Sequence, residues 1–167
     1  MKNIVLIGMP GVGKSTVGVI LAKMLNYDFV DCDLVIQKKT GKLLFEIIKE
    51  NGTDGFIKTE NQIIASLNFE RTVIATGGSA VYGKEAMENL KKSSVVVYLE
   101  LELNSLKKRL SDIKNRGVVI KDGQSIDELF CEREALYKKY ADITVCEDGL
   151  NVEETIEKIR FALDNLN

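Results

Sequence analysis

One stretch near the N-terminus constrains this chain more than any other. Residues 8–15 read Gly-Met-Pro-Gly-Val-Gly-Lys-Ser and match the pattern G-x-x-x-x-G-K-[ST] at every specified position. The apolar run before it, residues 3–7, is typical of a buried strand, and residues 15–25 after it carry apolar side chains at helical spacing. This strand–loop–helix context predicts a phosphate-binding loop and disfavours the alternative of a plain glycine-rich turn.

The residue types in this loop indicate which ligand it would hold. Glycines at positions 8, 11 and 13 let successive backbone N–H groups face one anion, and the positive end of the following helix dipole points to the same place. Lys14 can then reach the β- and γ-phosphates, and the Ser15 hydroxyl can ligate Mg²⁺. The predicted nucleotide contacts are Gly11, Val12, Gly13, Lys14, Ser15 and Thr16. We therefore expect a nucleoside triphosphate with Mg²⁺.

Length and composition limit the remaining classes of protein. The 167 residues suffice for a full hydrophobic core, and we expect a single domain over residues 1–167. A net charge of −2 gives no support for a nucleic-acid partner, and the apolar run 95–99 is too short to span a membrane. Histidine is absent, which excludes Ser-His-Asp catalysis and His-ligated metals. Proton transfer is left to Asp, Glu or Lys.

The cysteines and the N-terminus bear on the compartment. Cys32, Cys131 and Cys146 are odd in number and lack metal or redox spacing, which is typical of free thiols in a reducing compartment. The first apolar stretch runs straight into the phosphate loop, so its removal as a signal peptide would take the site with it. We expect a cytoplasmic protein that works as a monomer.

Strand and helix signals alternate along the chain. Strands are predicted at residues 3–7, 27–31, 73–75, 94–100 and 143–145. Helices are predicted at residues 15–25, 34–38, 43–50, 54–67, 84–92, 103–110, 126–140 and 152–166. This alternation predicts an α/β fold, a parallel sheet with helices on both faces. The polar stretch 111–124 interrupts the pattern, and we interpret it as a lid over the phosphates, against the alternative of disorder without a role.

Two aspartates follow the second predicted strand. Asp31 and Asp33 lie at its carboxyl end, where ligands bind in open parallel sheets. The pair can orient a Mg²⁺ shell and accept a proton from an attacking hydroxyl, and the alternative is that these carboxylates cap the next helix. Gly77 and Gly78 allow a ligand to approach the backbone, or form a plain turn. The arginines suited to phosphate are Arg109, Arg116 and Arg133, although each alone resembles an ordinary surface side chain.

Together these residues give the chain a resemblance to the shikimate kinases, and the resemblance spans nearly its whole length. It is carried by residues 8–16, 29–33, 55–56 with Glu60, 77–78, Arg109, 115–116, Arg133 with Tyr137, and 141–142. The resemblance implies a P-loop kinase fold of three α/β/α layers with a five-stranded parallel sheet, a substrate-binding region at about residues 31–62 and a lid at about residues 111–125. It also implies transfer of a phosphate from ATP, with Mg²⁺, to the 3-hydroxyl of shikimate.

The resemblance assigns roles to individual positions. Lys14 would stabilise the transferred charge, Ser15 and Asp31 would serve the metal, and Asp33 would bind the substrate hydroxyls and act as the base. Gly77, Gly78 and Arg133 would contact the substrate, with Arg133 pairing with its carboxylate. Arg116 would reach from the lid to the transferred phosphate, and Arg109 would pack on adenine.

Three positions depart from the family pattern. Ile57 stands where the family has an arginine that grips the carboxylate, Ser79 replaces a third glycine, and Gly117 replaces a proline in the lid. Lys58 is a candidate replacement for the arginine, although adjacent helical side chains point roughly 100° apart. Two alternatives therefore stay open beside a shikimate kinase: a kinase of the same fold with another small hydroxylated acceptor, and a catalytically silent nucleotide-binding module.

Overall fold

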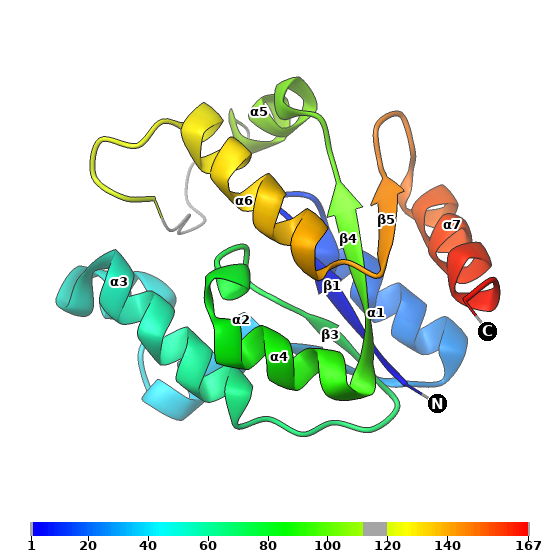
Figure 1. Ribbon diagram of the computed structural model, residues 1–167, viewed down its shortest axis with the longest axis horizontal. Coiled ribbons are helices and arrows are strands. Elements are labelled where there is room, and N and C mark those ends of the chain that lie inside the picture. The colour runs from blue at the N-terminus through cyan, green and yellow to red at the C-terminus, as the bar shows by residue number, and fades with distance from the viewer. Residues whose placement is uncertain (1, 112–119, 167) are drawn as a thin grey trace.

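The computed structural model describes residues 2–111 and 120–166. Arg116, Gly117 and most of the expected lid lie outside these ranges. Five parallel strands form one sheet in the order β2-β3-β1-β4-β5 (Figure 1). The strands are β1 (Asn3–Ile7), β2 (Asp28–Asp31), β3 (Thr72–Ala75), β4 (Ser94–Glu100) and β5 (Ile143–Cys146). The predicted five-stranded parallel sheet is confirmed.

The sheet is buried because its central strands are apolar on both faces. Every residue of β1 and of β3 is buried, which is the pattern of a parallel sheet covered by helices on each side. The helices are α1 (Lys14–Leu25), α2 (Cys32–Thr40), α3 (Leu44–Ala65), α4 (Lys84–Ser93), α5 (Leu103–Ser111), α6 (Ile126–Tyr140) and α7 (Val152–Asp164). Helices α1 and α7 pack side by side, and α4 and α6 both contact β4, so the fold has three layers (Figure 1). No helix in the described ranges is both long and apolar enough to cross a bilayer.

Some element boundaries differ from those predicted. Helix α2 begins at Cys32, directly after β2, because the Asp31 carboxylate accepts a hydrogen bond from the Asp33 backbone N–H at 3.0 Å and caps the helix. The two helices predicted at 43–50 and 54–67 form the single element α3, which kinks at Gly52 with a positive φ of 70°. A short 3-10 helix, η1 (Ala80–Tyr82), follows the Gly77–Gly78 turn and was not predicted.

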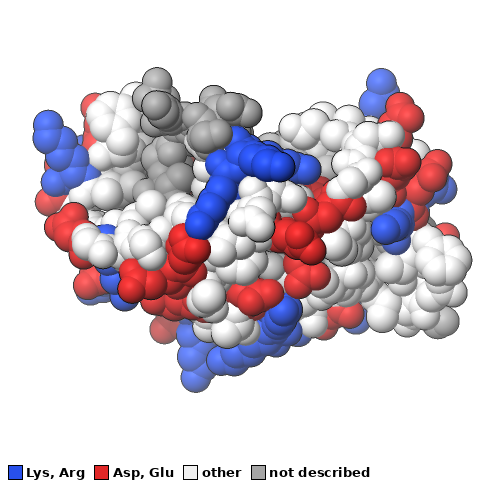
Figure 2. Space-filling model, turned by 90° about the horizontal axis from the view of Figure 1, so that it is seen from above, with Lys and Arg blue, Asp and Glu red and all other residues white. Residues whose placement is uncertain are grey.

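The topology brings the candidate functional residues to one edge of the sheet. The phosphate loop follows β1, the aspartates follow β2, and the Gly77–Gly78 turn follows β3. Because the strands are parallel, these carboxyl ends meet at the same edge. On the face seen from this side, Lys and Arg side chains are interspersed with Asp and Glu and do not form a continuous basic surface (Figure 2).

Candidate active site

The phosphate loop has the backbone conformation that its glycines allow. Gly8, Gly11 and Gly13 have φ values of 148°, 86° and 100°, which L side chains rarely adopt. A Cβ at Gly8 would lie 2.6 Å from the Leu99 carbonyl oxygen, so the loop passes against the end of β4 with no room for a side chain. Gly13 directly precedes α1, which points the positive end of the helix dipole at the loop.

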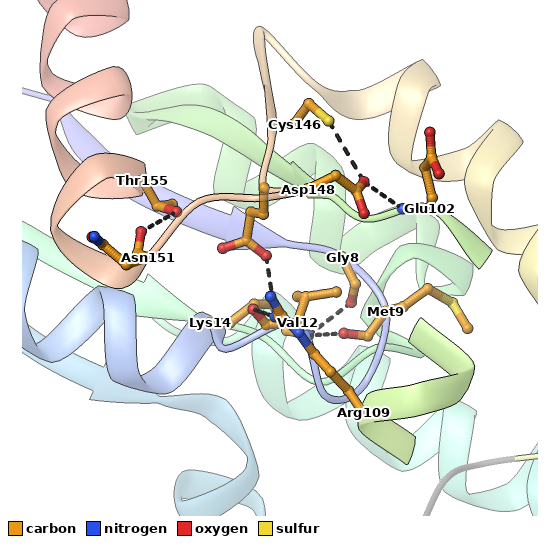
Figure 3. Close-up of polar contacts among 11 residues, drawn as sticks. Gly8, Met9, Val12, Lys14, Glu102, Arg109, Cys146, Asp148, Asn151 and Thr155 are labelled. Carbon is orange, nitrogen blue, oxygen red and sulfur yellow. Dashed lines mark hydrogen bonds and ion pairs between the residues drawn. The ribbon is translucent and has the colours of Figure 1, made fainter. Parts of the chain in front are cut away.

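Lys14 is held across this loop. Its Nζ donates hydrogen bonds to the carbonyl oxygens of Gly8 at 2.7 Å and Met9 at 2.9 Å (Figure 3). Burial lowers the pKa of Lys14 to about 8, and the nearby carboxylate of Asp33 opposes that shift. A phosphate beside this buried ammonium would supply the negative charge that stabilises its protonated form. The lysine is therefore placed to bind a polyphosphate.

Ser15 and Asp31 form a pair of hard oxygen donors at the same end of the site. The Ser15 hydroxyl donates a hydrogen bond to Asp31 Oδ2 at 2.6 Å, while Oδ1 of the same carboxylate caps α2. The capping interpretation of Asp31 is therefore confirmed, and the other oxygen of the same carboxylate stays next to Ser15, as a shared metal site would require. Among the described residues no cluster of three or more acidic or thiol ligands forms a cage for a cation. One hydroxyl and one carboxylate fit Mg²⁺, which is usually held by few protein ligands together with phosphate oxygens.

A cavity of about 530 Å³ extends from the phosphate loop to Arg133. It is lined by residues of the loop and of α1, by Asp31 and Asp33, by the turn from Gly77 to Ser79, and by apolar side chains of α2 and α3. Of the predicted substrate residues, Asp33, Gly77, Gly78 and Arg133 all line it. Burial raises the pKa of Asp33, and the neighbouring Asp31 carboxylate adds to the shift, which makes Asp33 a stronger proton acceptor.

The Gly77–Gly78 turn brings acidic and basic groups close together. A Cβ at Gly77 would lie 2.7 Å from Glu60 Oε1 and 2.8 Å from Asp33 Oδ1. A Cβ at Gly78 would lie 2.9 Å from Arg133 Nη1. The absence of a side chain at Gly77 leaves space for Glu60 and Asp33, and its absence at Gly78 leaves space for Arg133. A larger residue at either position would collide with these side chains.

Arg133 is buried, with 1% of its surface exposed, although it carries a charge. Its guanidinium lies over the Tyr82 ring, 5.4 Å from the ring centroid, and Tyr82 in turn hydrogen-bonds Glu132 on α6. The hydroxyl of Tyr137, one helical turn along α6, donates to the Gly78 carbonyl at 2.7 Å. These contacts hold the arginine beside the Gly77–Gly78 turn, where it lines the cavity.

Arg109, on α5, contacts the phosphate loop. Its Nη1 donates to the Val12 carbonyl at 3.1 Å and lies 3.8 Å from Glu147 Oε2 (Figure 3). Glu147 is 3% exposed, and burial raises its pKa to about 7 against the attraction of Arg109 and Lys14. The arginine is thus next to the loop that would hold the nucleotide, and the predicted Arg116 contact lies outside the described residues.

The structure does not bring Lys58 to the cavity. Phe56 and Glu60, four residues apart on α3, face the interior, so Lys58 between them lies on the opposite, exposed side of the helix. Ile57 packs beside the small apolar cluster of Ile36, Ile47 and Phe56 and does not line the cavity. The prediction that Lys58 contacts the substrate therefore has no support in the geometry.

Sequence reasoning missed two residues of the site. Glu60 is 1% exposed and its Oε2 accepts a hydrogen bond from the Ser79 hydroxyl at 2.6 Å. Ser79 was noted only as a departure from a family pattern, and Glu60 only as part of a motif. The pairing joins α3 to the turn after β3, nineteen residues apart, and no local spacing signals it.

A phosphate loop with its lysine and serine, an aspartate pair and a cavity that joins them define a P-loop kinase that acts on a small molecule. The model of the shikimate kinase family matches residues 10–164, and the chain belongs to this family. A shikimate kinase of Thermodesulfovibrio yellowstonii is 42% identical over 100% of this chain and 98% of its own length. One from Francisella tularensis subsp. novicida is 39% identical over 97% of this chain and 94% of its own.

Solved structures agree with this family. The shikimate kinase from Acinetobacter baumannii in complex with shikimate has a TM-score of 0.85 and 32% identity, covering 99% of this chain and 94% of its own. The shikimate kinase from Aquifex aeolicus has a TM-score of 0.83 and 33% identity, covering 97% of this chain and 96% of its own. The predicted fold class, a P-loop kinase with three α/β/α layers, is thereby confirmed.

Proposed function

We propose that this chain transfers the γ-phosphate of ATP to the 3-hydroxyl of shikimate, the reaction for which its family is named. The observation that carries the proposal is the single cavity that joins two kinds of site. Lys14, Ser15 and Asp31 line its phosphate end, and Asp33 and Arg133 line its acceptor end. A hydroxylated carboxylic acid fits that acceptor end, because it supplies hydroxyls for Asp33 and a carboxylate for Arg133.

In the proposed reaction Asp33 accepts the proton of the acceptor hydroxyl. The hydroxyl oxygen bonds to the γ-phosphorus, the bond from that phosphorus to the β–γ bridging oxygen breaks, and ADP leaves. Lys14 and the N–H groups of the loop stabilise the charge on the phosphates. Mg²⁺, held by Ser15 and Asp31, would neutralise phosphate charge. We assign Arg116 to the transferred phosphate and Arg109 to the adenine side, following the family pattern.

Two basic residues line the cavity in the described part of the chain. Lys14 lies at the phosphate end, and Arg133 lies with Asp33 at the acceptor end. One arginine matches one carboxylate, which agrees with a monocarboxylic acceptor. Ile57, at the position where the family has a second arginine, packs beside an apolar cluster outside the cavity and supplies no cation, so a hydroxylated acid other than shikimate is the second candidate.

We further propose that the enzyme works as a cytoplasmic monomer. Its three cysteines are free thiols, which is usual in a reducing compartment.

Coupled detection of ADP tests the proposed activity. We expect ADP to form with ATP, Mg²⁺ and shikimate, and Asp33→Asn to lower kcat by about a hundredfold or more, because general-base catalysis contributes roughly that factor. Asp28→Asn is the matched control, since Asp28 is exposed at the start of the same strand β2. No shikimate-dependent ADP at millimolar shikimate would contradict the proposal, and turnover of a different hydroxylated acid would favour the second candidate.

A further inference from the structure

Next to Gly77, which lines the cavity, lies a buried carboxyl group, Glu60, for which the proposed reaction has no role. Glu60 Oε1 and Asp33 Oδ1 both lie within 2.8 Å of the point where a Gly77 Cβ would be. The two carboxyl groups therefore converge on one face of Gly77. Asp33 has its role as the base, and Glu60 lies immediately beside it.

The two oxygens of Glu60 are in different situations. Oε2 accepts the hydrogen bond from Ser79, whose side chain is also buried. Oε1 is buried and has no hydrogen-bond partner among the described residues. A buried ionised oxygen without a donor is costly, whereas a protonated one carries no charge. Glu60 is therefore a carboxyl group whose protonation state depends on the charges around it.

Those charges come from three helices. On α2, Asp33 disfavours ionisation of Glu60, and the buried Cys32 thiol is also nearby; on α1 and α6, Lys14 and Arg133 favour ionisation. The buried Tyr137 on α6 also interacts electrostatically with Glu60. Burial is the largest influence and raises the pKa of Glu60 to about 7, although the hydrogen bond from Ser79 and the charges of Arg133 and Lys14 oppose the shift.

An acceptor anion would change this balance. Arg133 Nη1 lies 2.9 Å from the position of a Gly78 Cβ, so the arginine and the acid pair face neighbouring residues of one turn. A carboxylate that binds Arg133 brings negative charge close to Glu60 and offsets the positive charge that favours its ionised form. Both effects favour the protonated form of Glu60.

We propose that Glu60 makes acceptor binding proton-linked, because it takes up one proton at Oε1 from solvent when an anionic acceptor binds Arg133. The inference rests on the proposed function only in requiring such an acceptor. Since binding favours the protonated form, affinity is highest at low pH and falls as the pH rises through the range in which free Glu60 ionises. Ser79 acts in the opposite direction, because its hydroxyl stabilises the ionised form.

Calorimetric titration of the full chain with shikimate, in the presence of ADP and Mg²⁺, tests the inference. Each pH between about 6 and 8 is measured in two buffers of different ionisation enthalpy, which reports the protons taken up. For the wild type we expect proton uptake near neutral pH and a Kd about fivefold higher at the upper end of the range. Glu60→Gln cannot ionise, so its Kd should change less than about twofold and its proton uptake should disappear.

Two features make the comparison decisive. Asp33 and Lys14 are present in both proteins, so a pH dependence that arose from either of them would persist in Glu60→Gln. Ser79→Ala keeps Glu60 but removes its hydrogen bond, and we expect the fall in affinity to move to higher pH, which tests the inference even if Glu60→Gln folds poorly.

Equal pH dependence in the wild type and Glu60→Gln would overturn the inference, as would a wild-type Kd that does not change with pH. An unshifted profile for Ser79→Ala would also count against it. No binding of shikimate at any pH would instead contradict the proposed function, so the two failures are distinguishable.

Discussion

Arg133 shows how one side chain can be placed for recognition before any substrate arrives. The guanidinium is buried between the Gly78 turn and the Tyr82 ring. Its planar fork can form two parallel hydrogen bonds with a carboxylate, which the single ammonium of a lysine cannot. Burial also keeps competing water away, so the geometry of the fork matters as much as its charge.

We therefore expect Arg133→Lys to raise the KM for shikimate about tenfold or more and to leave the KM for ATP nearly unchanged, since a charge-assisted bidentate contact is worth ~1.5–3 kcal/mol. Steady-state kinetics with each substrate varied in turn measures both values. Lys58→Ala is the control, because Lys58 lies on the outer side of α3 and should leave both KM values unchanged. A rise for Lys58→Ala as large as that for Arg133→Lys would contradict this picture of the acceptor pocket.

Lys14 and Lys58 illustrate what a sequence can and cannot predict about the position of a single side chain. Lys14 belongs to a contiguous motif whose backbone geometry follows from its glycines, so its position could be predicted. Lys58 was considered because it is adjacent to Ile57. Its exposure depends on the orientation of α3 against the sheet, which no local pattern encodes. Glu60 and Ser79 were missed for the same reason, because their contact is tertiary.

At the scale of elements, the phosphate loop depends on how closely β1 and β4 are packed. The two strands pair in parallel from Asn3 with Ser94 to Ile7 with Tyr98, and the loop leaves β1 at Gly8 directly against the Leu99 carbonyl. Gly8 combines a positive φ of 148° with this lack of space. The loop conformation and the strand pairing are therefore linked at one residue.

We expect Gly8→Ala to destabilise the fold by about 3 kcal/mol or more, because the added Cβ meets backbone that cannot rotate away and φ is strained as well. Gly41→Ala is the matched control. Gly41 also has a positive φ, 69°, but open space around it, so its loss should be near 1 kcal/mol. Urea unfolding followed by circular dichroism measures both. Equal losses for the two variants would show that packing against Leu99 adds nothing to the strain.

Elements with a strong local signal agree with their predicted positions. Helix α6 spans residues 126–140 as expected, since Ser125 forms a capping box with Glu128 at its start. The break predicted at residues 51–52 also exists, as a kink at Gly52, whose backbone leaves the helical conformation within α3. The start of α2 was predicted too late. Its capping residue, Asp31, is also the last residue of β2, so no loop separates the strand from the helix.

For the molecule as a whole, the parallel sheet gathers buried charge at one edge. Lys14, Glu60, Arg133 and Glu147 are all at most 7% exposed and come from four different elements or their ends. Burial of a charged group costs free energy unless its partners compensate. We infer that the preorganised site at this edge lowers the free energy of unfolding. Replacing one buried acid at a time can measure by how much.

Glu147 permits the clearest measurement of that cost. Its pKa is raised by burial from an ordinary 4.5 to about 7, so between these values the folded protein holds a proton that the unfolded chain releases. The folded state therefore loses stability relative to the unfolded state as the pH rises through this range. The penalty is absent below the unfolded value and complete above the folded one.

We expect Glu147→Gln to gain stability relative to the wild type by about 1–3 kcal/mol between about pH 4.5 and pH 8, because glutamine keeps the shape but cannot ionise. The measurement is the free energy of urea unfolding of both proteins across this range. Glu157→Gln, at an exposed position on α7, controls for the loss of one negative charge and should show no such trend. A stability difference that stays constant with pH, or that grows toward acid, would mean that Glu147 remains ionised beside Arg109 and that this ion pair fully compensates its burial.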